Sequence, residues 1–369
     1  MICGKVTETL KESSDVLLRL NGQIAMAKYK KLIWTILSLL LAAMTIWAVL
    51  SQLGEMPLRS LAETVREADA RYLAAAVVCG ALFVVLEGEA IRCLLRGAGY
   101  PRRLRSGLLY SAADVYFSAV TPSASGGQPA SALFMMGDGV PAGVVTATLI
   151  VNLVMYTFSV VLLGLGAAAT SFGLLRGFRL LSRILIAVGF AILAGLTLFF
   201  FALLGNGDAV FGALRNLSRL LHRWKLLPRL DNILRRLDHA QQDYDECAAL
   251  FRGQTAMLLR AFILNFLQRA SQIAVPMFTY LALGGSAAVA PKVYASQCFV
   301  TIGYNCVPVP GAMGVADYLM VDAFTDLVGR EEALHLEVLS RSISFYICVA
   351  VSGLIVLGGY CRQRIRKRR

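Results

Sequence analysis

Long uncharged apolar runs recur along the 369-residue chain. Four of them have at least 19 residues, and they cover 32–53, 142–175, 184–204 and 342–360. A helix of about 20 residues crosses a hydrocarbon core about 30 Å thick. Two further stretches, 72–97 and 261–283, are long enough although each contains a few charged residues. The pattern predicts an all-α polytopic membrane protein with about six transmembrane helices.

Two other apolar stretches, 106–137 and 293–316, are interrupted near their middles. The interruptions are clusters of proline and glycine: Pro122, Gly126, Gly127 and Pro129 in the first stretch, and Pro308, Pro310, Gly311 and Gly314 in the second. Proline ends the preceding helix and glycine permits a turn, while about ten helical residues on either side suffice for half a bilayer. We therefore expect two re-entrant helical hairpins, with two kinked spans as the alternative.

The distribution of positive charge decides between these alternatives. The net charge is +13, and with two hairpins the segments 1–31, 92–105, 205–255 and 362–369 lie on one side and carry 25 of the 36 Lys and Arg residues. This side is the cytoplasm by the positive-inside rule. The placement of the charge indicates membrane topology and not nucleic-acid binding. Both termini are expected to be cytoplasmic, with no cleavable signal peptide ahead of the first apolar run.

This topology divides the chain. A cytoplasmic segment 1–31 precedes a membrane domain over 32–360, and a basic cytoplasmic tail follows at 361–369. Within the membrane domain, a first unit at about 71–175 and a second at about 256–360 flank the cytoplasmic loop 205–255. Each unit reads span, hairpin, span, in opposite orientation across the membrane. The hairpins and spans thus form an inverted-topology repeat, an arrangement typical of secondary transporters with a site near the midplane.

The hairpin tips and the charges inside the membrane are the candidate site. A helix that restarts near Gln128, and another after Pro310, would each point unpaired N–H groups at a lipid phosphate. Ionisable side chains within a membrane suggest function. The candidate substrate-binding residues are Asp114, Thr121, Ser123, Ser125, Gly126, Gly127, Gln128, Arg269, Gly311, Gly314 and Asp317, and the candidate cavity charges are Glu87, Glu89 and Arg92.

Purely structural interpretations of these residues stay open. Glu89 and Arg92 are three positions apart and would form an ion pair on one helix surface. Arg269 would pair with Asp114 or with Asp317, or the two tips would merely pack together. The basic apolar stretch within 205–255 is expected to lie on the cytoplasmic membrane surface.

Cysteine and histidine give no sign of a metal site, a cofactor or catalysis. The eight cysteines contain no C-x-x-C pair, and the three histidines, His222, His239 and His335, have no ligand spacing. No acid–base constellation or activated nucleophile stands out. The sequence therefore predicts a protein that is not an enzyme and holds no metal or cofactor.

Three motifs resemble the membrane domain of the lysylphosphatidylglycerol synthase/flippase family, the multiple peptide resistance factors. They are "TPSASGGQPA", the following "MMGDGV", and "PVPGAMGVAD" near the C-terminal end. The family pattern has Glu or Gln where Gln128 stands, and Glu where this chain has Asp317. The resemblance implies a bacterial plasma-membrane protein that moves an aminoacylated phospholipid, such as lysyl-phosphatidylglycerol, between leaflets and so contributes to cationic peptide resistance.

The resemblance also bears on partners. Full-length members carry a soluble synthase domain, which we do not expect in this protein. A separate synthase is therefore a candidate partner beside phospholipid, and a homo-oligomer is a further candidate. Two alternatives to a flippase stay open. One is an ion-coupled transporter of a small soluble solute, and the other is a membrane subunit of a lipid aminoacyl-transfer system that binds its synthase through 205–255.

Overall fold

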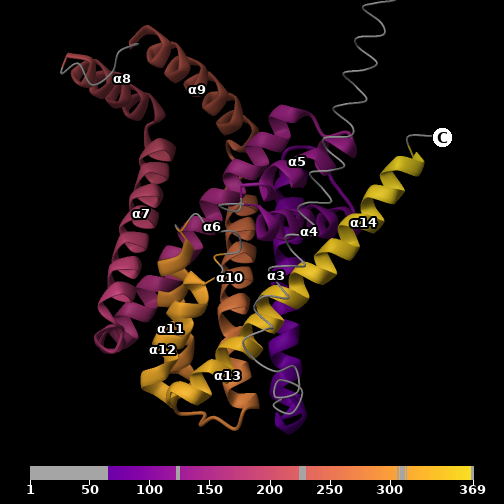
Figure 1. The fold of residues 1–369 in the computed structure, drawn as a ribbon. Helices are drawn as coiled ribbons and strands as arrows, with labels where there is room; N and C mark the ends of the chain where they lie inside the picture. The colour runs from indigo at the N-terminus through magenta and orange to yellow at the C-terminus, as the bar shows by residue number, and fades with distance from the viewer. Residues whose placement is uncertain are drawn as a thin grey trace, which may run out of the picture. The chain divides into compact units, whose positions relative to one another are not determined.

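The computed structural model describes residues 65–121, 125–223, 230–305, 307, 312 and 314–366, which belong to one compact unit. Every regular element in these ranges is helical (Figure 1). The α-helices are α3 (Ala70–Gly97), α4 (Leu104–Val120), α5 (Gly127–Gly137), α6 (Ala142–Ser171), α7 (Leu180–Gly205), α8 (Gly207–Arg223), α9 (Leu230–Phe251), α10 (Thr255–Ala282), α11 (Ala290–Asn305), α12 (Val315–Val328), α13 (Arg330–Arg341) and α14 (Cys348–Arg366). A 3-10 turn, η2 (Phe172–Arg176), follows α6, and a π-helical turn, η4 (Ser342–Ile347), joins α13 to α14.

The predicted all-α membrane architecture is confirmed. Among the described residues, four continuous helices are long and apolar enough to cross a membrane: Ala70–Gly97, Ala142–Arg176, Leu180–Leu203 and Arg330–Gln363. A fifth crossing is obtained if α9 and α10, which meet at an angle of 99°, are counted together. The predicted first span, 32–53, lies outside the described residues.

The sixth predicted span is only part of a longer helix. The sequence placed this span at 342–360, whereas the structure has one helical run that begins at Arg330 and passes through η4. The first turns of this run contain charged residues, among them Glu331, Glu332 and Arg341. The uncharged part of the sequence therefore begins only at Ser342, twelve residues after the helix does. The run therefore carries Arg341 into the protein as part of a spanning helix.

Both interrupted stretches form two short helices with a break between them. α4 and α5 have 17 and 11 residues, and α11 and α12 have 16 and 14, so each is shorter than the about 20 residues that cross a membrane. The two helices of each pair pack along each other, so the chain turns back at the break. Side-by-side packing favours hairpins over kinked spans.

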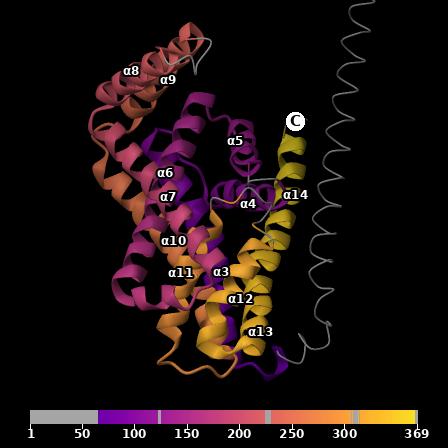
Figure 2. The same ribbon diagram turned by 60° about the vertical axis from the view of Figure 1, so that its left-hand side comes forward.

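The two hairpins lie toward opposite ends of the described unit. In Figure 1, α5 lies in the upper half with α8, α9 and the C-terminal end of α14, while α12 and α13 lie in the lower half. Figure 2, which is turned about the vertical axis, keeps these heights. The segments rich in Lys and Arg, 205–255 and the end of α14, thus share the end of the first hairpin.

The packing of the helices is reciprocal. α3 and α10 lie against each other at the centre, and each carries the first helix of the hairpin that follows it, α4 or α11. α4 also packs on α14, the last helix of the second unit, while α11 packs on α6, the last helix of the first unit. Exchanging the two units therefore reproduces these contacts.

Apolar side chains cover the outer faces of the long helices. Leu180 and Leu198 on α7 are each 69% exposed, and Leu354 on α14 is 71% exposed. Exposed leucine at this density suits a lipid environment, because hydrocarbon replaces water as the solvent. The buried apolar clusters instead lie where the hairpins pack, for example at Phe299, Leu319 and Phe324.

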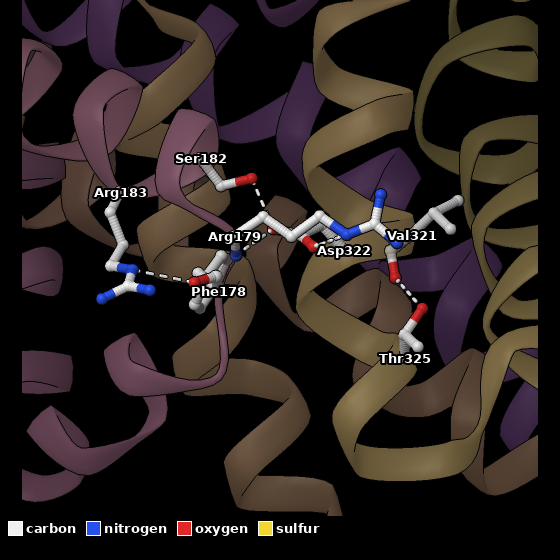
Figure 3. A network of polar contacts seen from close by, with 7 residues as sticks. All are labelled: Phe178, Arg179, Ser182, Arg183, Val321, Asp322 and Thr325. Carbon is white, nitrogen blue, oxygen red and sulfur yellow. Dashed lines mark hydrogen bonds and ion pairs between the residues drawn. The ribbon is translucent and has the colours of Figure 1, made fainter.

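The second hairpin is attached to the start of α7 by a buried carboxylate, as Figure 3 shows. Asp322 on α12 is 9% exposed and accepts hydrogen bonds from the backbone N–H of Arg179, at 3.0 Å, and from the Ser182 hydroxyl. The Arg179 guanidinium lies 3.5 Å from its other oxygen. Because no side chain of α7 itself caps this helix, Asp322 supplies the cap from α12.

We expect Asp322→Ala to lower the free energy of unfolding by about 2 kcal/mol, because it leaves the buried Ser182 hydroxyl and the Arg179 N–H without their acceptor. Thermal unfolding in detergent, followed by near-UV circular dichroism, measures the change. Thr325→Val is the matched control on the same helix, since the Thr325 hydroxyl bonds only the Val321 carbonyl one turn away, at 2.6 Å. Equal unfolding temperatures for the two variants would show that Asp322 does not hold α12 to α7.

Candidate functional site

A cavity of about 630 Å³ lies between the two hairpins and the central helices. Side chains from α3, α4, α5, α6, α10 and α11 line it, together with the second tip, η4 and the start of α14. Both polar and aromatic groups face it, which is the composition of sites that bind small molecules or lipid headgroups. Both hairpin tips reach this cavity, through Ser125 and Gln128 in the first and Ala312 in the second.

The Thr121 side chain stabilises the break between α4 and α5 in the first hairpin. Its hydroxyl donates to the Phe117 carbonyl at 2.5 Å and accepts from the backbone N–H of Gly126 at 2.8 Å. α5 restarts at Gly127, one residue before the predicted position. This arrangement satisfies backbone groups at the break, as irregular backbone at membrane depth requires.

Gly127 allows the start of α5 to touch α4. A Cβ at this position would overlap the side-chain oxygens of Asp114 and Ser118 and also approach the Asp114 carbonyl. The first turn of α5 therefore lies directly against a carboxylate, which the partial positive charge of a helix N-terminus favours. Gly127 is a packing residue rather than a surface of the cavity.

Two carboxyl groups meet at this wall of the cavity. Glu87 on α3 is 6% exposed and is a neighbour of Asp114 on α4, which stands three positions after the Ser111 that contacts Glu87. The Ser111 hydroxyl donates to Glu87 at 3.2 Å, and the Gln268 amide nitrogen lies 3.4 Å from the same oxygen. Ser118 donates to Asp114, also at 3.2 Å. Both carboxyl groups line the cavity.

The Arg269 guanidinium faces these carboxyl groups from α10. It lies over the ring of Tyr156, 3.9 Å from the centroid, and 5.2 Å from the ring centre of Phe83. Its terminal nitrogen donates to Gln272, whereas its buried Nε has no hydrogen-bond partner among the described residues. Stacking between two aromatic rings holds the cation in place while leaving it able to bind an anion.

Arg269 belongs to a polar stripe on α10. Asn265, Gln268 and Gln272 share its face at helical spacing, and all of them line the cavity. Asn265 donates to the Asn152 side chain on α6 at 3.0 Å. This bond joins the central helix to the last helix of the first unit inside the apolar region.

The second tip is built around Asp317. This residue stands in the first turn of α12 and accepts from the Gly314 backbone N–H at 2.8 Å, while Gly314 has a φ of 76° that favours glycine. The other carboxylate oxygen lies 2.7 Å from Nε of Arg341, and the two side chains are 19% and 9% exposed. The shorter side chain of Asp317 thus reaches both partners at this position.

Arg341 brings that ion pair to the cavity wall. Its guanidinium lies over the Phe345 ring, 4.7 Å from the centroid, and Arg341, Ser344 and Phe345 line the cavity. Ser344 and Phe345 belong to the π-helical turn η4. Such turns widen a helix locally and are often found at functional sites.

The structure brings together five of the predicted site residues: Glu87, Asp114, Ser125, Gln128 and Arg269 line the cavity. Five more support its walls, where Thr121, Gly126 and Gly127 shape the first tip, and Gly314 and Asp317 the second. Ser123 and Gly311 lie outside the described residues.

Glu89 and Arg92 do not line the cavity. They form an ion pair with each other, as the alternative for them predicted, and line a separate cavity of about 420 Å³ between the end of α3 and the start of α10. Successive residues of a helix are about 100° apart, so Glu87 and Glu89 point in nearly opposite directions. Arg269 likewise departs from one expectation, since Asp317 takes Arg341 as its ion-pair partner.

Sequence reasoning missed several groups of the site. Arg341, Tyr156 and the amides of Asn152, Asn265 and Asn305 all line the cavity. The Tyr156 hydroxyl accepts from the Asn305 amide at 2.8 Å, so the ring under Arg269 is tied to the second hairpin. The four polar residues at helical spacing on α10 were a usable signal, because amides in an apolar helix are costly unless they face a polar interior.

Comparison with known proteins agrees with this architecture. A search of curated proteins finds no match. The family model described as the lysylphosphatidylglycerol synthase TM region matches residues 35–352, which includes both hairpins and all of the cavity described above. The chain therefore belongs to the family of lysylphosphatidylglycerol synthase transmembrane regions, whose membrane role is in lipid handling.

Proposed function

We propose that this protein is a phospholipid flippase that moves an aminoacylated phospholipid, such as lysyl-phosphatidylglycerol, between the leaflets of the bacterial plasma membrane. The observation that carries the proposal is the cavity between the hairpin tips, in which carboxyl groups and arginines face the same space. The headgroup of such a lipid carries both ammonium and phosphate. A cavity with both kinds of charge complements it, whereas a simple ion requires one.

The charges suggest an orientation for the headgroup. Its ammonium groups would approach Glu87 and Asp114, and its phosphate would approach Arg269, with Arg341 across the cavity. The acyl chains would stay in lipid beside the exposed apolar faces of the long helices. Nothing in this arrangement requires a covalent step, so the proposed activity is transport and not aminoacyl transfer.

Alternating exposure of the cavity would move the headgroup. Reciprocal packing of the two units and the placement of the hairpins toward opposite ends support an inverted repeat. In such repeats, rocking of one unit against the other opens a central site to each side in turn. Hairpin one, the loop 205–255 and both termini would face the cytoplasm, and the loop would attract anionic lipid.

A leaflet-exchange assay in proteoliposomes tests the proposal, with labelled phosphatidylglycerol and its lysyl ester as substrates. We expect Arg269→Gln to raise the lipid concentration for half-maximal exchange about tenfold, because a charge-assisted bond to phosphate contributes about 1.5 kcal/mol or more. Arg219→Gln is the matched control, since Arg219 is exposed on α8 and, within the described residues, hydrogen-bonds Asn216 alone.

The outcomes separate the candidates. Protein-dependent exchange that falls in Arg269→Gln but not in Arg219→Gln supports the flippase. Folded wild-type protein that exchanges neither lipid contradicts it. Equal exchange by both variants would place the phosphate elsewhere than at Arg269.

A further inference from the structure

The closeness of Glu87 and Asp114 implies a proton. Ser111, which donates to Glu87, is three positions before Asp114 on α4, so the two carboxyl groups are neighbours in the same cavity wall. Two like charges side by side in a buried wall repel each other, which favours the state in which one of the two carboxyl groups is protonated. Both groups come from helices of the membrane domain, and their remaining contacts include donors, namely Ser111, Ser118 and Gln268. The pair therefore carries one negative charge with its proton and two without it.

The Gln268 side chain gives this wall of the cavity an oxygen that can accept a further hydrogen bond. Its side chain is 1% exposed and its amide nitrogen is directed to Glu87, while its Oε1 has no hydrogen-bond partner in the described part of the chain. A buried amide oxygen without a donor is costly. An ammonium group between Gln268 and the two carboxyl groups would supply donors to all three.

We propose that Glu87 and Asp114 share one proton, and that this proton leaves the pair when a cationic substrate group binds in the cavity. The inference rests on the proposed function, since it takes the ammonium groups of the lipid headgroup as the cation. The O–H bond of the protonated carboxyl breaks, the proton passes to water in the cavity, and no covalent bond forms to the ammonium. The pair and its cation then carry the same net charge as the pair and its proton.

This exchange would make the flippase a proton antiporter for cationic lipid. When the cavity is open to one side of the membrane, a proton would bind the pair and release the ammonium group of the lipid. When it is open to the other side, an ammonium group would bind and release the proton. The pair titrates as a unit, because each carboxyl group depends on the state of its neighbour. A proton gradient would then set the direction of lipid movement.

Other ionisable groups around the pair modulate the exchange without replacing it. Those facing the pair or sharing its cavity are Arg269 on α10, Tyr156 on α6, Tyr304 on α11, and Arg341 and Cys348 on the last long helix. Among the described residues that line this cavity, Glu87 and Asp114 supply the carboxyl groups, so we assign the exchange to this pair.

Purified full-length protein in detergent provides the test, with short-chain lysyl-phosphatidylglycerol as the cationic probe and short-chain phosphatidylglycerol as the control. Infrared spectra should show the carbonyl stretch of a protonated carboxyl, which Glu87→Gln and Asp114→Asn each abolish. Binding of the lysyl lipid should release about one proton per chain, and its affinity should rise about tenfold per pH unit while the pair is protonated. In both variants the affinity should lose this dependence.

The controls keep the two proposals apart. Glu89→Gln, a carboxyl change two residues away in the other cavity, should keep both the band and the pH dependence. Leaflet exchange of the lysyl lipid without proton release, or absence of the carboxyl band in folded wild type, would overturn this inference and leave the flippase standing. Folded protein that shows the band but exchanges neither lipid would overturn the flippase, and the antiport with it.

Discussion

Arg341→Met is expected to be among the most destabilising single changes in the described part of the chain. The substitution keeps an unbranched side chain over Phe345 but removes the cation from Asp317. Breaking a buried ion pair from one side costs about 3 to 5 kcal/mol, because the remaining charge stays buried without compensation. Thermal unfolding in detergent should therefore show a large fall in the midpoint, and leaflet exchange should be lost.

A double-mutant cycle isolates the ion pair. Asp317→Asn removes the carboxylate charge but keeps an oxygen that can accept from the Gly314 N–H. Combined with Arg341→Met, it should recover part of the stability lost by Arg341→Met alone, because neither charge is then left unpaired. Strictly additive losses would contradict the pairing.

Arg179→Met is the matched control. Arg179 also faces a carboxylate, that of Asp322, but its side chain is 66% exposed and the charged atoms are 3.5 Å apart. An exposed arginine in such a pair contributes about 1 kcal/mol or less. Comparable losses of stability for Arg179→Met and Arg341→Met would show that burial of the arginine does not determine how much each ion pair of the second hairpin stabilises the protein.

The positions of the hairpins could be predicted because their cause is local. Proline lacks a backbone donor and glycine permits unusual turns, so the breaks were visible in single residues such as Pro122 and Gly314. Even the restart of α5 was located to within one residue. The long uncharged runs identified α6 and α7 for the same reason, since hydropathy is a property of each residue.

Partners across the fold could not be predicted in this way. Arg341 and Asp317 are 24 positions apart and meet only because α13 continues into the spanning helix, which an uncharged-run criterion cut at Ser342. Tyr156 and Arg269 belong to different units but stack on each other, and the sequence around either residue does not indicate this contact. The register that brings such pairs together is set by the packing of whole helices.

Helical periodicity could have improved the prediction of the site. Glu87, Glu89 and Arg92 are close in sequence, but the helical period spreads them around α3. Applied to α10, the same periodicity would have grouped Asn265, Gln268 and Gln272 with Arg269 on one face. Residue type alone indicated which side chains are costly in a membrane, and periodicity indicates which of them share a cavity.

Gly127→Ala is expected to impair both folding and transport through a single methyl group. The added Cβ would overlap Oδ1 of Asp114 and Oγ of Ser118, and it would also crowd the Asp114 carbonyl. Overpacking of this kind costs about 1 to 3 kcal/mol when neighbours can shift. Here one neighbour is helix backbone, so the cost should reach the upper end of that range, with a fall in unfolding temperature and loss of leaflet exchange.

The matched control and a partial rescue identify the cause. Gly143→Ala, in the first turn of α6, adds the same methyl group where no heavy atom lies within 4 Å, and it should leave stability and exchange near wild type. Adding Ser118→Ala to Gly127→Ala removes one overlapping oxygen but leaves the Asp114 carbonyl, so only part of the loss should return. If Gly127→Ala instead behaves as Gly143→Ala does, α5 does not press against Asp114. The position of Asp114 beside Glu87 would then need a support other than α5.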